Sequence, residues 1–153
     1  MGFLCLYIKT VFCQDNLDAF PLDTGSLVAI INRRDQFHGW VTSQWDNIEP
    51  PLLTCEAVIS EACFLLRNVY GGQDAVINLV KNGVIKVPFN LDDESVIIGE
   101  FLKIYQSVPM SFADACLVRM SELYNDSFLL TFDSDFLVYR RNKNQVIPVI
   151  MPQ

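Results

Sequence analysis

Two apolar stretches of the sequence each end abruptly in an aspartate followed by small or polar residues. The first is Leu22-Asp23-Thr24-Gly25, and the second is Thr131-Phe132-Asp133-Ser134-Asp135. Both patterns are typical of a strand that turns directly into a helix. In an open parallel sheet, the carboxyl ends of the strands face the crevice where ligands bind, so acidic residues at such ends are positioned for chemistry. Asp23 and Asp135 also suit helix N-caps, and both roles stay open at this point.

Two further carboxylates border the apolar faces of predicted helices. Glu61 lies three residues after Val58 in a predicted helix over residues 55–69, and Asp114 lies in the first turns of another over residues 111–124. Residues three or four apart share a helix face, so Glu61 should lie against or beside the buried side chains. A carboxylate in that position needs a polar partner, because burial without one is costly.

Four carboxylates that converge on one site need a divalent cation to neutralise them. The four are Asp23, Glu61, Asp114 and Asp133. Mg²⁺ and Mn²⁺ prefer such oxygen ligands, whereas zinc favours histidines or paired cysteines, and this sequence has one histidine and five cysteines without a C-x-x-C pair. The chemistry indicated is metal-assisted phosphoryl transfer. Acidic residues in other first turns, Glu56 and the run at 92–94, are expected to offset the helix dipole.

The elements that must position these groups alternate between short apolar strands and helical crossovers. Strands are predicted at residues 18–22, 52–54, 84–89, 127–131 and 146–150, and helices at residues 24–33, 36–48, 55–69, 73–81, 92–106 and 111–124. Crossovers of this length join parallel strands. We therefore predict an α/β fold, a three-layer α/β/α sandwich with a mostly parallel central sheet. Pro21 breaks one rule, because proline cannot donate to the ladder of a central strand.

The composition fits one soluble domain. The 153 residues suit a single domain over residues 18–153, preceded by an N-terminal extension or edge strand over residues 1–17. No stretch approaches the ~18 uninterrupted apolar residues of a membrane span, and the odd number of cysteines favours a reducing compartment, so we expect a cytoplasmic protein. The net charge of −7 repels nucleic acid unless a metal neutralises the carboxylates at the site.

The four acidic positions lie in motifs that resemble those of the PIN-domain family, and specifically its VapC-like single-domain ribonucleases of toxin–antitoxin systems. The motifs are Leu22-Asp23-Thr24-Gly25, Thr54-Cys55-Glu56-Ala57-Val58-Ile59-Ser60-Glu61-Ala62, Phe112-Ala113-Asp114-Ala115 and Leu130-Thr131-Phe132-Asp133-Ser134-Asp135-Phe136. The resemblance implies catalytic and metal-binding roles for Asp23, Glu61 and Asp114, with Asp133 as the fourth carboxylate and Asp135 as a further metal-binding candidate. It implies supporting hydroxyls at Thr24 and Thr131.

The resemblance also implies an RNA substrate, Mg²⁺ or Mn²⁺ as cofactor, a homodimer, and an antitoxin whose amphipathic helix covers the active site. Basic groups that could hold an RNA backbone are Arg33, Arg34, Arg140, Arg141 and Lys143, with a solvated surface as the alternative. Aromatic groups that could stack on bases are Phe37, Trp40 and Tyr139, with core packing as the alternative. Candidates for a protein interface are Trp40, Trp45, Phe101 and Tyr105. The fold also allows a second function, a non-catalytic interaction module in a protein or RNA complex.

Overall fold

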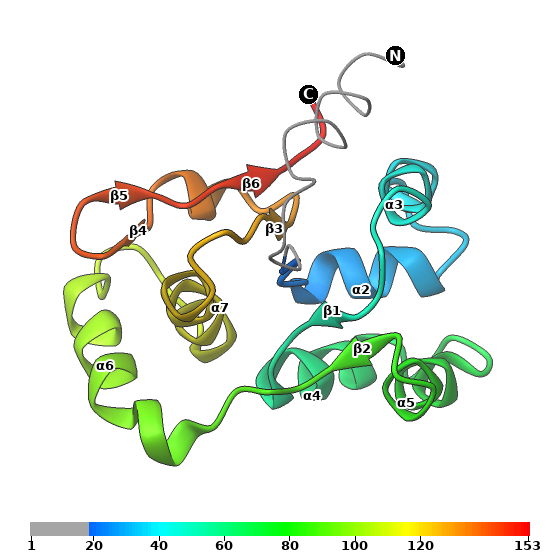
Figure 1. The fold of residues 1–153 in the computed structure, drawn as a ribbon. Helices are drawn as coiled ribbons and strands as arrows, with labels where there is room; N and C mark the ends of the chain where they lie inside the picture. Colours follow the sequence, from blue (N-terminus) through cyan, green and yellow to red (C-terminus); the bar gives the residue numbers. More distant parts are fainter. Residues whose placement is uncertain (1–18) are drawn as a thin grey trace.

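The computed structural model describes residues 19–153, which form a parallel sheet with helices packed against it (Figure 1). Strand β1 (Leu52–Leu53) pairs in parallel with β2 (Ile85–Lys86), and β3 (Leu129–Leu130) pairs in parallel with β6 (Val149–Ile150). Residues 19–22 join the two pairs through parallel bridges to β1 on one side and to β3 on the other. The predicted mostly parallel sheet is confirmed. The predicted extension over residues 1–17 lies outside the described residues.

Pro21 lies in the central segment of this sheet, a position that proline does not usually occupy because it cannot donate a hydrogen bond to the ladder. The N–H of Leu22 donates to the Leu53 carbonyl at 2.8 Å, and the Pro21 carbonyl accepts from the Leu130 N–H at 2.9 Å. Proline therefore still contributes an acceptor, and its neighbour contributes the donor on the opposite side. The segment pairs through isolated bridges instead of the continuous strand predicted for residues 18–22, as expected where a donor is missing.

Six α-helices occur in the described residues at the six predicted positions. They are α2 (Thr24–Ile31), α3 (His38–Trp45), α4 (Glu56–Leu65), α5 (Gly72–Lys81), α6 (Leu91–Ile104) and α7 (Phe112–Leu123). Side-chain caps explain three of the starting points. Asp23 caps α2, Asn90 caps α6, and Ser111 caps α7, each accepting a hydrogen bond from a first-turn N–H. None of the helices in residues 19–153 is long and apolar enough to cross a membrane.

The helices form two groups. Helix α2 packs against α3, α4 and α5, whereas α6 packs mainly against α7. Figure 1 shows α6 and α7 on one side of the molecule and α2, α3 and α5 on the other. Right-handed crossovers explain this arrangement, because the first two crossovers run in one direction along the sheet and the third returns across it. Arg119 of α7 holds Glu94 of α6 at 2.5 Å. The predicted three-layer sandwich is confirmed.

The C-terminal part of the chain departs from the prediction of one strand over residues 146–150. A short 3₁₀ helix, η1 (Ser134–Leu137), leads into a hairpin of β4 (Arg140–Arg141) and β5 (Gln145–Val146), and β6 follows separately. The hairpin turn places Asn142 and Lys143 at positive φ. Strand β5 pairs with β4 whereas β6 pairs with β3, so Pro148 separates two short strands with different partners.

Candidate active site

Asp23 ends the central segment of the sheet and at the same time caps helix α2. Its Oδ1 accepts from the Ser26 N–H at 2.7 Å, and its Oδ2 accepts from the Thr131 hydroxyl. The Ser26 hydroxyl in turn donates to the Leu130 carbonyl at 3.0 Å, which ties the start of α2 to β3. Only 5% of Asp23 is exposed. The N-cap role left open by the sequence is real, and it coexists with a position at the carboxyl edge of the sheet.

Burial raises the pKa of Asp23 from its usual range to about 6. The hydrogen bonds from Thr131 and Ser26 act in the opposite direction because they stabilise the charged form, and the charge of Asp133 adds to the increase. A carboxylate that is already difficult to ionise, with another carboxylate near it, is a group that a cation would stabilise.

Thr131 brings the two strand ends together. While its hydroxyl donates to Asp23, its oxygen accepts from the Asp133 N–H at 3.0 Å. The Asp133 carboxylate is exposed and caps η1, accepting from the Asp135 N–H at 2.9 Å. The alternative role of Asp135 as a helix N-cap is therefore wrong, because Asp133 occupies that position and Asp135 lies in the first turn.

Asp114 is held at the start of α7 by a reciprocal capping box. Its N–H donates to the Ser111 hydroxyl and its Oδ2 accepts from the Ser111 N–H, both at 3.0 Å. The Tyr139 hydroxyl donates to the same Oδ2 at 3.3 Å. Burial raises the pKa of Asp114, and the charge of Asp133 raises it further. Asp133 is thus an electrostatic neighbour of both Asp23 and Asp114.

Tyr139 connects the carboxylates of α7 and η1. Burial raises the pKa of its phenol, and the charges of Asp114, Asp135 and Asp133 raise it further, so the hydroxyl stays protonated and donates. Tyr139 is fully buried, which makes it a positioning group instead of the base-stacking surface suggested by the sequence. Its edge contacts with Tyr105 and Phe136 fix the ring.

Glu61 reaches the same edge of the sheet from α4. It is exposed, while its helix neighbours Val58 and Ala62 are fully buried, as the predicted border position requires. The partner that a carboxylate needs there is Thr24, whose hydroxyl donates to Glu61 Oε2 at 2.7 Å. Because Thr24 directly follows Asp23, this hydrogen bond links α4 to the end of the central strand segment.

Small residues allow the close packing around this site. A Cβ on Gly25 would lie 2.8 Å from the ring of Phe132, so only glycine permits this approach of α2 to the segment after β3. Ser26 and Ser111 are site residues that sequence reasoning missed. Both carry a recognisable signal, since each stands three residues from an acidic partner in a capping pattern.

The predicted RNA-binding arginines divide into two groups. Arg140 donates to the carbonyls of Leu137, Val138 and Tyr139, and Arg141 donates to those of Ser121 and Asn125. Both guanidinium groups therefore stabilise the main chain that follows η1 and the C-terminal end of α7. Arg33, Arg34 and Lys143 are exposed.

The other predicted stacking aromatics and interface residues pack within the protein. Phe37 stacks on Phe132 with ring centroids 4.4 Å apart, and Trp40 meets the same ring edge-on. Of the candidates for a protein interface, Phe101 is buried, and the other three pack partly buried against the core. For Phe37 and Trp40 the structure therefore supports the alternative of packing within the protein, and the buried Phe101 is excluded as an interface residue.

Within residues 19–153, no three acidic, histidine or cysteine side chains already surround one point as metal ligands would. The groups that do meet at this edge of the sheet are carboxylates and hydroxyls. Such oxygen donors suit Mg²⁺ or Mn²⁺ and do not suit a softer metal. The charge of Asp133, which contributes to the raised pKa of both Asp23 and Asp114, is consistent with that chemistry.

Comparisons with known proteins agree with this fold. The family model described as PIN domain matches residues 21–142. Among solved structures, the chain is similar to Mycobacterium tuberculosis VapC20, described as a Sarcin-Ricin loop cleaving toxin, with a TM-score of 0.69 and 23% identity over 76% of this chain and 91% of that one. At that identity the likeness concerns the fold. No curated protein sequence matches this chain.

Proposed function

The chain belongs to the PIN-domain family, and we propose that it is a metal-dependent endoribonuclease that hydrolyses RNA phosphodiester bonds. The proposed catalytic carboxylates are Asp23, Glu61, Asp114 and Asp133. The observation that carries the proposal is geometric: the Thr131 hydroxyl donates to Asp23 and accepts from the Asp133 N–H, which brings the carboxylates of two strand ends together. Burial raises the pKa of both Asp23 and Asp114, and the nearby charge of Asp133 contributes to each increase. Negative groups gathered in this way favour a bound cation and, through it, a phosphate.

The proposed metal ligands are the same four carboxylates, with Asp135 as a further candidate. When bound, Mg²⁺ or Mn²⁺ lowers the pKa of a coordinated water and stabilises the oxygens of an in-line displacement. Thr131 orients Asp23, Thr24 orients Glu61, and Tyr139 orients Asp114, each through a donated hydrogen bond. These donors fix the carboxylates before substrate arrives, which is what preorganised catalysis requires.

The substrate and partners follow from the family relationship. VapC20 is described as a Sarcin-Ricin loop cleaving toxin, and we extend to this chain the general expectation of an RNA substrate and of an antitoxin in the cytoplasm. Exposed Arg33, Arg34 and Lys143 are the predicted cations left available for an RNA backbone.

The direct test is cleavage of RNA by the purified protein with MnCl₂, with EDTA, and with the Asp23→Asn variant. We expect cleavage by the wild type only in the presence of the metal, and a loss of at least ~100-fold in the variant. Asp126→Asn, an exposed carboxylate elsewhere, is the matched control and should cleave normally. Cleavage in EDTA would contradict the metal-dependent mechanism, and no cleavage at all by a correctly folded protein would instead support the non-catalytic interaction module.

Self-association is a second expectation. Large apolar side chains remain exposed on α4 and α5, namely Phe64 (62%), Leu65 (54%) and Ile77 (52%). Exposed apolar side chains on two helices that pack together favour a protein interface, so we propose that α4 and α5 contribute to a homodimer. Light scattering should give the dimer mass in the micromolar range, and Leu65→Glu should reduce it to the monomer. A wild-type monomer at high micromolar concentration would contradict the dimer.

A further inference from the structure

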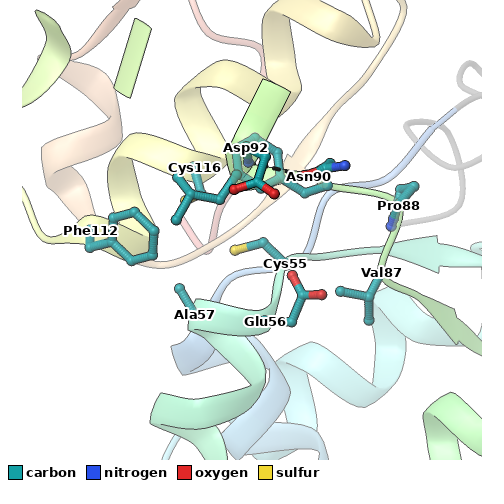
Figure 2. Close-up of a pocket in the computed structure, with 11 residues that line it drawn as sticks. Cys55, Glu56, Ala57, Val87, Pro88, Asn90, Asp92, Phe112 and Cys116 are labelled. Carbon is teal, nitrogen blue, oxygen red and sulfur yellow. Dashed lines mark hydrogen bonds between the residues drawn. The ribbon is translucent and has the colours of Figure 1, made fainter. Parts of the chain in front are cut away.

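A pocket of about 620 Å³ opens where the first turns of α4, α6 and α7 meet (Figure 2). Cys55 and Cys116, both almost completely buried, are among the residues that line it. Val87 and Pro88 close one end, and Phe112 stands at the other. The size is typical of pockets that hold small molecules or parts of larger ones.

The pocket adjoins the proposed catalytic carboxylates through two helices. Phe112 is the first residue of α7, and Asp114 lies two residues later in the same turn. Glu56 is the first residue of α4, and Glu61 follows about 7.5 Å further along the helix axis. Both helices therefore carry a proposed catalytic carboxylate within five residues of a residue that lines the pocket. A substrate held at the carboxylates can therefore place a neighbouring nucleotide in this pocket.

The side chains of the pocket combine one aromatic face with several hydrogen-bond acceptors. Phe112 is 42% exposed, which is unusual for an aromatic residue at the start of a helix that packs on the core. In Figure 2 the carboxylates of Glu56 and Asp92 lie on either side of Cys55, and Asn90 lies beside Asp92. Aromatic stacking with hydrogen bonds to a base edge is the usual recognition of single-stranded RNA.

The charge of the pocket excludes a phosphate as its ligand. Glu56 and Asp92 are acidic, and no lysine or arginine belongs to the residues that line this pocket. Carboxylates accept hydrogen bonds from the N–H groups of bases. Guanine presents two adjacent donors, N1–H and the N2 amino group, which one carboxylate accepts together. Uracil presents a single donor at that edge.

We propose that this pocket binds a nucleobase of the RNA substrate, with guanine preferred, at a nucleotide beside the scissile phosphate. The proposal rests on the proposed function, since it assigns part of the substrate specificity of the same enzyme. Phe112 supplies the stacking surface, and Glu56 and Asp92 supply the acceptors that select donor-rich bases.

The test is a binding measurement that involves no cleavage. The wild-type protein in EDTA is titrated with the RNA hexamers UUUGUU and UUUUUU, and binding is followed by the NMR shifts of the backbone amides of Asn90, Asp92 and Phe112. We expect those amides to shift with the guanine-containing hexamer, and the all-uracil hexamer to bind more weakly. Equal affinity for both hexamers, or shifts confined to other regions, would overturn the assignment of the pocket.

Variants separate stacking from general structural effects. Phe112→Ala should weaken binding of UUUGUU about 5- to 150-fold, whereas Phe112→Trp keeps an aromatic face and should restore it. Leu123→Ala, at the other end of α7 and 44% exposed, is the matched control and should bind as the wild type does. Equal losses in Phe112→Ala and Leu123→Ala would contradict a stacking role.

A second pair of variants tests the acceptors. Asp92→Asn should reduce the preference for guanine over uracil, while Asp93→Asn, which alters the next residue outside the pocket, should retain it. If Asp92→Asn and Glu56→Gln both kept the wild-type preference for guanine over uracil, the carboxylates would not select the base. Guanine binding by a protein that cleaves no RNA would contradict the proposed function alone, and cleavage without pocket shifts would contradict this inference alone.

Discussion

The two strand ends that carry aspartates have similar sequences but different surroundings. Asp23 follows the central strand segment and is 5% exposed, whereas Asp133 follows β3 and is exposed. Both cap a helix, and Thr131 contacts both. The difference arises because helix α2 and strand β3 enclose Asp23, while η1 leaves Asp133 at the surface. The same local motif therefore produces one carboxylate that is difficult to ionise and one that is free to approach a ligand.

The largest expected effect concerns activity at these two ends. We expect Asp23→Asn and Asp133→Asn each to lower kcat by at least ~100-fold, because each removes a proposed ligand while retaining the volume of the side chain. Glu61→Gln and Asp114→Asn should have effects of similar size. Steady-state cleavage of a labelled RNA measures them, with circular dichroism to confirm folding. Rates near wild type in all four variants would reject the proposed site.

Asp135 provides the control for that comparison, since it belongs to the same segment as Asp133. Asp135→Asn should lower kcat less than Asp133→Asn does, because Asp133 is the carboxylate whose charge affects both Asp23 and Asp114. The reverse order would mean that Asp135 is the functional carboxylate of this segment.

The second effect is a pH dependence of stability. The pKa of Asp23 is raised from 3.8 to about 6, so the folded metal-free protein binds more protons than the unfolded chain between those values. The free energy of unfolding therefore falls as the pH rises from about 4 to about 6, by about 3 kcal/mol, and stays lower above that range.

Urea unfolding at pH 4 and pH 7.5 measures this dependence. Asp23→Asn should remove most of it and should be more stable than the wild type at pH 7.5 without metal. Asp133→Asn should retain most of it, because burial of Asp23 is the main cause. The same pH dependence in the wild type and in Asp23→Asn would show that another group is responsible.

The third effect is stabilisation by the metal. If Mn²⁺ binds only the native state, a concentration a hundredfold above its Kd adds about 2.7 kcal/mol to the free energy of unfolding. Thermal melts at pH 7.5 with and without 10 mM MnCl₂ should therefore show an increase of several degrees in the wild type. Asp23→Asn should gain far less. An equal gain in both proteins would place the ion elsewhere.

The smallest effect concerns how the carboxylates are held. Asp114 is fixed by the local capping box with Ser111, whereas Asp23 depends on the distant Thr131. Ser111→Ala should lower the free energy of unfolding by about 1 kcal/mol through loss of the cap. Ser60→Ala, at an exposed position within α4, should instead be neutral or slightly stabilising. Equal effects in urea unfolding would mean that the capping box contributes nothing.

Local signals in the sequence were sufficient for the six helices and the parallel strands, but not for η1 or the hairpin of β4 and β5. Asp23, Asn90 and Ser111 mark the starts of three helices because a capping side chain acts within three residues of its own position. The helical crossovers predicted the parallel sheet, since parallel strands require a crossover of that length. The motifs also indicated which four carboxylates to consider.

Tertiary structure alone decided the environment of each of those groups. Asp23 receives a hydrogen bond from Thr131, 108 residues later in the chain, and its burial depends on strands and helices from both ends of the sequence. Arg140 and Arg141 bind main-chain carbonyls, and Phe37 and Trp40 pack on Phe132, although their sequence neighbours predicted surface roles. Burial, charge and hydrogen-bond partners depend on residues brought together from distant positions, so a local pattern names the candidates and only the folded chain determines their chemistry.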